Sequence, residues 1–172
     1  MNKLSAKKIA RIAIIAALYA VCTFVFAPIS YGAIQFRISE CLCVLAFFYF
    51  EGVIGLTIGC FIANIFGNGP LDLVFGTLAT LMASYCAFKT AKLIKNELAR
   101  FFTCAIYPII FNALIVPFTF LLVTELKELY FISMLQVALG QAVVILTLGL
   151  FLYLAISKRI AKTGGSVFKK LH

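Results

Sequence analysis

Polar side chains interrupt the long apolar stretches of this chain. They are its candidate functional residues. A polar group among apolar residues is costly unless it is paired, hydrated or used to bind something. Amides, carboxylates and a guanidinium suit a small polar molecule, which they hold by directional hydrogen bonds. The residues concerned are Ser30, Tyr31, Gln35, Arg37, Ser39, Glu40, Asn64, Asn68, Asp72, Asn112, Gln136 and Gln141.

Catalytic and metal-binding patterns are absent from the sequence. It has no phosphate-binding loop, no H-E-x-x-H and no G-x-S-x-G, and its one histidine is His172. The six cysteines include no C-x-x-C pair and all lie in apolar stretches, where cysteine is usually a small buried hydrophobe. We therefore expect no enzyme activity, no metal and no cofactor.

Composition shows which kind of element must position the polar residues. The chain has 172 residues, of which 64% are hydrophobic and 12% charged, and its mean hydropathy is +1.11. Such a chain is far more apolar than a soluble domain. Since a membrane-spanning helix needs roughly 20 apolar residues, the length predicts an all-α membrane protein of about six spans. We expect one transmembrane domain, residues 1–172.

The spans are predicted from hydropathy with Gly, Pro and charged residues as breaks. The apolar run Ile12–Ala27 follows basic residues, as in a secretory signal, but it is long for one, so we interpret it as the first span. The predicted spans are 9–28, 38–50, 53–67, 71–89, 101–124 and 129–157.

Basic residues predict the orientation, because cytoplasmic segments retain Lys and Arg. The formal charge is +9, and every basic residue except Arg37 and Lys127 falls before or at the start of span one, between the end of span four and span five, or after span six. Both termini are therefore expected in the cytoplasm of a multi-pass plasma-membrane protein, and nucleic acid is not an expected partner. Residues 89–100 read as an amphipathic helical extension with lysines at three-residue spacing.

This topology brings the polar residues together in the outer half of the membrane. Structural alternatives remain open for each group. Arg37 and Glu40, three residues apart, can neutralise each other. Asn64 and Asp72 can cap or close the turn between their helices.

Amides deeper in the membrane have an alternative of their own. Asn112 and Gln141 can hydrogen-bond between helices, a packing device worth about 1 kcal/mol. The convergence of the polar residues favours a cavity for a small molecule over any of these separate roles.

Span one carries small residues on one helical face. Ala13 and Ala17, like Ala16 and Ala20, form small-x-x-x-small pairs, which allow close approach of another helix in lipid. That helix can belong to a partner or to the same chain, and the spacing alone does not decide between them.

Four stretches carry a resemblance to a known family. They are Ile29–Glu40 (ISYGAIQFRISE), Gly59–Asn64 (GCFIAN), Leu71–Leu81 (LDLVFGTLATL) and Asn112–Val116 (NALIV). With their spacing they resemble the QueT family, the queuosine-precursor substrate-binding subunits (S components) of energy-coupling-factor (ECF) transporters. The resemblance covers nearly the whole chain.

The resemblance implies a six-helix subunit that captures a 7-deazaguanine base, such as queuine or its aminomethyl precursor, from outside. It also implies partners: a transmembrane coupling subunit, EcfT, and two ATPase subunits. The alanine face of Ala13, Ala16, Ala17 and Ala20 resembles the family's docking surface for the coupling subunit. The implied substrate-binding residues are Tyr31, Gln35, Phe36, Arg37, Glu40, Asn64, Asp72, Asn112 and Gln141.

One position departs from the family pattern. Many members have Gly-Glu in the last helix where this sequence has Gly140-Gln141. An amide still accepts and donates a hydrogen bond, but it loses the charge-assisted pairing of a carboxylate. A subunit for another vitamin or amino acid therefore stays open, as do a small proton-coupled transporter and a structural membrane protein without a ligand.

Overall fold

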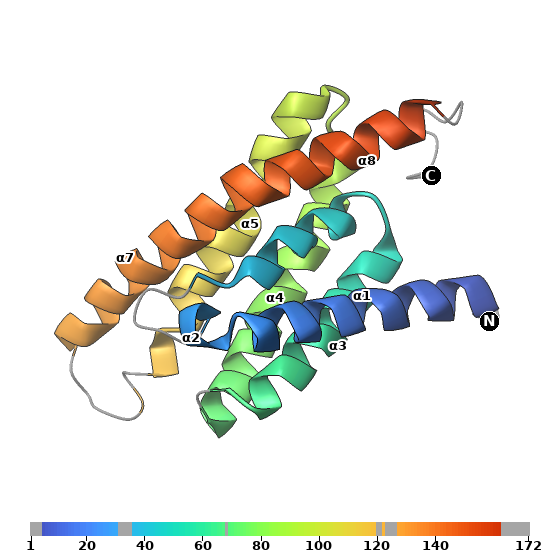
Figure 1. Ribbon diagram of the computed structural model, residues 1–172. Helices are drawn as coiled ribbons and strands as arrows, with labels where there is room; N and C mark the ends of the chain where they lie inside the picture. The colour runs from blue at the N-terminus through green and yellow to red at the C-terminus, as the bar shows by residue number, and fades with distance from the viewer. Residues whose placement is uncertain (1–4, 31–35, 68, 120–121, 123–126, 163–172) are drawn as a thin grey trace.

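The structure of the chain is a computed structural model that describes residues 5–30, 36–67, 69–119, 122 and 127–162. All regular elements in this described part are helical, and Figure 1 shows them packed as a bundle. The elements are α1 (Ala6–Val25), α2 (Ala27–Ser30), η1 (Ile38–Phe47), α3 (Phe50–Ile65), α4 (Pro70–Ala91), α5 (Glu97–Ile115), α7 (Lys127–Val144), η2 (Ile145–Gly149) and α8 (Leu150–Lys162).

Four helical segments in the described part are long and apolar enough to cross a membrane. They are Ala6–Val25, Pro70–Ala91, Glu97–Ile115 and Glu128–Lys162, and two shorter apolar helices, η1 and α3, accompany them. The predicted all-helical membrane architecture is thereby confirmed. The count of six spans and the placement of the termini stay predictions.

Successive helices run in opposite directions through the bundle (Figure 1). The start of α1, the α4–α5 connection and the end of α8 lie at one end of the molecule. The start of η1 and the α3–α4 turn lie at the other end. The predicted basic segments therefore share one end, and most of the predicted polar residues lie toward the opposite end. We call these the basic end and the polar end.

Glycines allow α1 and α3 to pack with their backbones in contact. A Cβ atom at Gly59 would lie 2.7 Å from the Cβ of Tyr19 and 2.8 Å from the carbonyl oxygen of Ala16. At Gly55 it would lie 2.8 Å from the Cβ of Ile15. These distances are shorter than real Cβ contacts, so both positions require glycine for this packing.

An aromatic cluster fills the core toward the basic end. The rings of Phe48 and Tyr153 stack with centroids 5.1 Å apart, and Phe101 lies 5.3 Å from Tyr153. The helix η1, which is a ten-residue 3₁₀ helix, supplies Phe47 to the same cluster. These rings join η1 to α5 through Phe101 and to α8 through Tyr153.

The connection between α4 and α5 differs from the predicted helical extension over residues 89–100. Helix α4 ends at Ala91, and α5 begins at Glu97. The Asn96 side-chain oxygen accepts hydrogen bonds from the backbone N–H groups of Leu98 and Ala99, at 3.0 and 3.1 Å. An N-cap of this kind starts a new helix, and the prediction of one continuous helix was wrong because it overlooked this signal.

Candidate functional site

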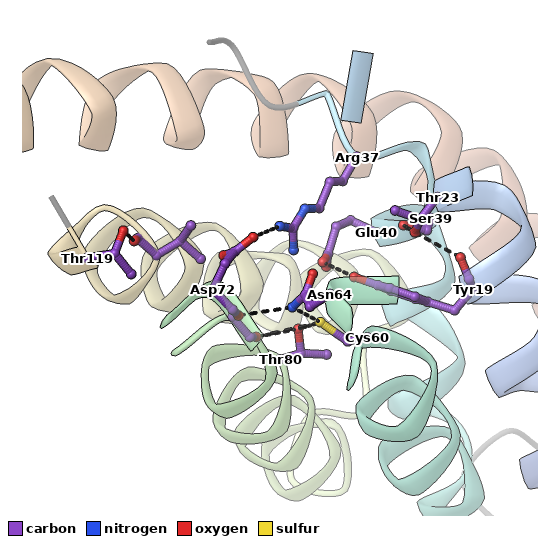
Figure 2. Close-up of polar contacts among 12 residues, drawn as sticks. Tyr19, Thr23, Arg37, Ser39, Glu40, Cys60, Asn64, Asp72, Thr80 and Thr119 are labelled. Atoms are coloured by element: carbon purple, nitrogen blue, oxygen red, sulfur yellow. Dashed lines mark hydrogen bonds and ion pairs between the residues drawn. The ribbon is translucent and has the colours of Figure 1, made fainter. Parts of the chain in front are cut away.

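A buried ion pair joins η1 to α4 at the polar end. Arg37, which precedes η1, places Nη2 3.0 Å from Oδ2 of Asp72, in the first turn of α4 (Figure 2). The two side chains are 2% and 6% exposed. Arg37 thus pairs across helices rather than with Glu40, the nearby partner that local spacing offered. Removing one member of such a buried pair strongly destabilises the protein, because it leaves the other charge buried and unpaired.

Asn64 extends this cluster from the end of α3. Its Nδ2 donates to the carbonyl oxygen of Asp72 at 3.2 Å and approaches Cys60 Sγ at 3.4 Å. The Asn64 amide therefore joins α3 to α4, as expected if Asn64 closes the turn between these two helices. It uses only its N–H groups for this, because Asn64 Oδ1 is buried and makes no hydrogen bond within the described residues.

The side chains of Arg37, Asn64 and Asp72 lie close to Gly76 of α4. A Cβ atom there would be 2.8 Å from Asn64 Nδ2, 3.2 Å from Asp72 Oδ1 and 3.8 Å from Arg37 Nη1. Arg37, Asn64 and Asp72 are therefore gathered at one place on α4. We call these three residues the Arg37 cluster.

Unsatisfied acceptors distinguish the Arg37 cluster from an ordinary packing network. Asn64 Oδ1 and Asp72 Oδ1 are both buried and accept no hydrogen bond in the described part of the chain. Leaving a buried acceptor unpaired costs about 1–3 kcal/mol. Two such atoms beside a buried guanidinium suit a ligand that donates hydrogen bonds and also accepts one.

Glu40 is buried completely and belongs to a neighbouring network. Its Oε1 accepts a hydrogen bond from Tyr19 OH at 2.5 Å, and its Oε2 accepts from Cys43 Sγ at 2.8 Å. In Figure 2 Arg37 and Glu40 stand next to each other, and Glu40 reaches toward Tyr19 of α1. This network therefore lies beside the Arg37 cluster.

Sequence reasoning missed four members of these networks, Tyr19, Cys43, Cys60 and Thr80. Tyr19 has no charge that would mark it in an apolar helix. Cys60 was interpreted as a hydrophobe, yet its sulfur accepts from Thr80 Oγ1 at 3.2 Å. The available signal was helical spacing: Cys60 and Asn64 are four residues apart on α3, as are Gly76 and Thr80 on α4, so each pair shares a helix face.

The deeper amides have no partner in the described residues. Asn112 and Gln141 are each 2% exposed, and Asn112 Oδ1, Asn112 Nδ2 and Gln141 Oε1 are buried without hydrogen bonds. The alternative of interhelical hydrogen bonds is therefore not realised by these atoms. No polar contact among the described residues joins either amide to the Arg37 cluster.

The remaining predicted ligand-binding residues divide into two groups. Phe36 is partly buried next to Arg37, and its backbone N–H donates to Ile29 at 3.1 Å. Tyr31 and Gln35 lie outside the described residues. The described residues contain no group of three or more His, Cys, Asp and Glu side chains that could hold a metal.

The four alanines of α1 face two directions. Ala16 and Ala20 are 5% and 6% exposed and lie inside the bundle, where Ala16 meets Gly59 of α3. Ala13 and Ala17 are exposed. The alanine pattern thus serves packing within the chain on one side of α1 and leaves small residues uncovered on the other.

Comparison with known proteins identifies the family of the chain. The QueT transporter family model matches residues 9–158. The queuosine precursor transporter QueT of Lactococcus lactis subsp. cremoris (strain MG1363) is 44% identical over 84 residues, 48% of this chain and 50% of that protein. The chain thus spans about half the length of the curated relative that it matches. No solved structure matches. With its apolar spans, this is a multi-pass protein of the cell membrane, and the chain belongs to the QueT transporter family.

Proposed function

We propose that this chain binds a queuosine precursor, a 7-deazaguanine base such as queuine or its aminomethyl precursor, for uptake from outside the cell. The observation that carries the proposal is the pair of unpaired acceptors, Asn64 Oδ1 and Asp72 Oδ1, beside the Arg37 guanidinium. A deazaguanine presents an amino group and a ring N–H as donors and a carbonyl as acceptor. The two oxygens and the guanidinium complement that edge.

The rest of the binding site is proposed from the same complementarity. Asn112 offers a further donor and acceptor, and Gln141 a further acceptor, all buried and unpaired in the described residues. Phe36 or Tyr31 is proposed to stack on the flat face of the base, and Gln35 is proposed as a further substrate-binding residue. Glu40 is proposed to contribute through its position beside Arg37, held by Tyr19 and Cys43.

Energy for uptake is proposed to come from partners of the ECF type. The sequence has no phosphate-binding loop, and we propose that two ATPase subunits supply ATP hydrolysis through the coupling subunit EcfT. The exposed residues Ala13 and Ala17 are the proposed contact for EcfT, since small residues let another helix approach closely.

Thermal unfolding of the detergent-purified chain against a panel of small molecules tests the substrate. Ligand binding to the native state raises apparent stability by mass action. We expect queuine and its aminomethyl precursor to raise the melting temperature, while guanine, common vitamins and tryptophan leave it unchanged. A shift with a vitamin or an amino acid alone would replace the substrate and keep the transporter type.

Asn112→Leu makes the test specific to the proposed site. Replacing an unsatisfied buried amide with an apolar side chain of similar size is neutral or stabilising. The ligand-free variant should therefore unfold at the wild-type temperature or above it, yet lose most of the ligand-dependent shift. An undiminished shift would remove Asn112 from the site.

Transport assays separate the proposal from a proton-coupled transporter. The purified chain alone in liposomes should bind the base and not accumulate it when a proton gradient is applied. Accumulation should require EcfT, the ATPases and ATP. Gradient-driven accumulation by the chain alone would favour the proton-coupled alternative.

A further inference from the structure

Arg100 is a second buried cation, at the opposite end of the molecule from the Arg37 cluster. It lies in the first turns of α5 and is 1% exposed. Its Nε and Nη1 atoms are buried and make no hydrogen bond with the described residues. An isolated buried charge costs several kcal/mol, so a guanidinium in this setting requires an anion.

The surroundings of Arg100 supply no carboxylate for this purpose. Within the described part of the chain, the ion pairs are Arg11 with Glu51 and Arg37 with Asp72. Glu97, three residues earlier on α5, has an exposed side chain, and its backbone carbonyl accepts from Tyr153 OH at 3.0 Å. The described residues therefore hold no carboxylate paired with Arg100.

The first turn of α5 is joined to the first turn of α8 near Arg100. The bond from Tyr153 OH to the carbonyl oxygen of Glu97 holds these two helices together three residues before Arg100. The Nε and Nη1 atoms of Arg100 are N–H donors without an acceptor among the described residues, and such a guanidinium edge suits an oxyanion.

Charge and position indicate which oxyanion. The same end of the molecule carries Lys92 and Lys95 between α4 and α5, and Lys158, Arg159 and Lys162 at the end of α8 (Figure 1). Basic pockets between helices at the cytoplasmic side of a membrane attract anionic lipid headgroups. Bidentate hydrogen bonding to phosphate is a property of arginine that lysine lacks.

We propose that Arg100, near the contact between the start of α5 and α8, binds the phosphate of an anionic phospholipid in the leaflet at the basic end. The headgroup enters from the bilayer interface, and the length of the arginine side chain lets the guanidinium move toward it. This site is separate from the proposed ligand site, so its test does not depend on the substrate.

Melting temperatures of the full chain in lipid nanodiscs test this site. The probes are nanodiscs of phosphatidylcholine alone and nanodiscs with phosphatidylglycerol added. Wild type should gain several degrees from phosphatidylglycerol. Arg100→Met should lose that gain, yet melt in phosphatidylcholine at or above the wild-type temperature, because the lone buried charge is gone. Lys95→Met, which removes the same charge from an exposed side chain, should keep the gain.

Two results overturn the proposal. In the first, Arg100→Met keeps the full gain in melting temperature, or Lys95→Met loses as much of that gain as Arg100→Met does. Diffuse surface charge then explains the lipid effect. If inorganic phosphate added to phosphatidylcholine nanodiscs gives the same gain, the source is a soluble anion and not a lipid. Should Arg100→Met fail to fold, Arg100→Lys should still lose most of the gain, and full retention by this variant overturns the role of the guanidinium.

Discussion

At the scale of single residues, buried charges at the polar end take partners from distant helices. Arg37 pairs with Asp72 of α4, and Glu40 accepts from Tyr19 of α1. Each bond therefore ties the start of η1 to a different helix. The apolar residues of η1 pack in the core, and these buried polar bonds fix its first turn in the bundle as well.

Tyr19→Phe tests the bond to Glu40. The variant leaves Glu40 Oε1 buried without its donor, so we expect a loss of about 1–3 kcal/mol in unfolding free energy. Denaturant or thermal unfolding in detergent measures it. Tyr85→Phe is the matched control, because Tyr85 is 44% exposed and its loss of a hydroxyl should change little. Equal stability of both variants would contradict the bond.

Gly76→Ala tests whether the Arg37 cluster binds the ligand. The added Cβ would lie 2.8 Å from Asn64 Nδ2 and 3.2 Å from Asp72 Oδ1, so both side chains must shift. We expect the dissociation constant for the deazaguanine to rise at least about tenfold, equivalent to about 1.4 kcal/mol, in a folded protein.

Gly149→Ala is the matched control for Gly76→Ala. Its added Cβ would meet Val44 Cγ2 at 3.4 Å and Ile145 Cγ2 at 3.5 Å, which is ordinary contact distance. Ligand titration of both variants by thermal shift or calorimetry makes the comparison. Unchanged affinity in Gly76→Ala would show that the ligand binds elsewhere.

Polar residues were easier to predict as a set than as partners. An ionisable side chain in an apolar stretch stands out in any sequence, so Arg37, Glu40 and Asp72 were found. Their pairing depends on which helices adjoin, and local spacing wrongly offered Arg37 with Glu40 as the simplest pair. Tyr19 was missed because a tyrosine in a membrane helix carries no charge to mark it.

At the scale of helices, hydropathy located the elements and missed their local geometry. Predicted span 71–89 corresponds to α4, Pro70–Ala91, and predicted span 53–67 to α3, Phe50–Ile65. The predicted fifth span, 101–124, was displaced from α5, Glu97–Ile115, because hydropathy does not register a polar first turn. The 3₁₀ form of η1 and the π-helical turn η2 leave no hydropathy signal, since they follow from packing.

Asn96→Ala tests the boundary between α4 and α5. Losing the side-chain acceptor for two backbone N–H groups should cost about 1 kcal/mol of stability. Asn96→Asp should retain most of it, because aspartate caps equally well. Ligand affinity should not change in either variant, since the cap lies at the basic end. A melting temperature of Asn96→Ala equal to wild type would contradict the role of the cap.

At the scale of the whole molecule, the two ends of the bundle differ in chemistry. The basic end carries the lysines of the α4–α5 connection and of α8, and the polar end carries the Arg37 cluster. Positive charge retained in the cytoplasm would then orient the Arg37 cluster outward, where a substrate arrives. The sequence alone predicted this difference between the two ends. Helices that alternate in direction bring the basic segments of the chain to the same end.

The two sides of α1 lead to opposite expectations for adjacent alanines. Ala16 is buried against α3, where a Cβ on Gly59 would already lie 2.8 Å from its carbonyl oxygen. Ala17, the next residue, is exposed and belongs to the proposed contact with EcfT. One helix would thus pack within the chain on one side and dock a partner on the other.

Ala16→Leu and Ala17→Leu separate these two roles. Ala16→Leu overpacks the α1–α3 contact and should cost about 1–3 kcal/mol, lowering the melting temperature of the isolated chain. Ala17→Leu should leave that temperature and ligand binding unchanged, yet reduce co-purification with EcfT and the ATPases. Ala99→Leu, on an exposed position of α5, should affect neither measurement. Complex formation by Ala17→Leu at the wild-type level would place the docking surface on another helix, while leaving the binding proposal intact.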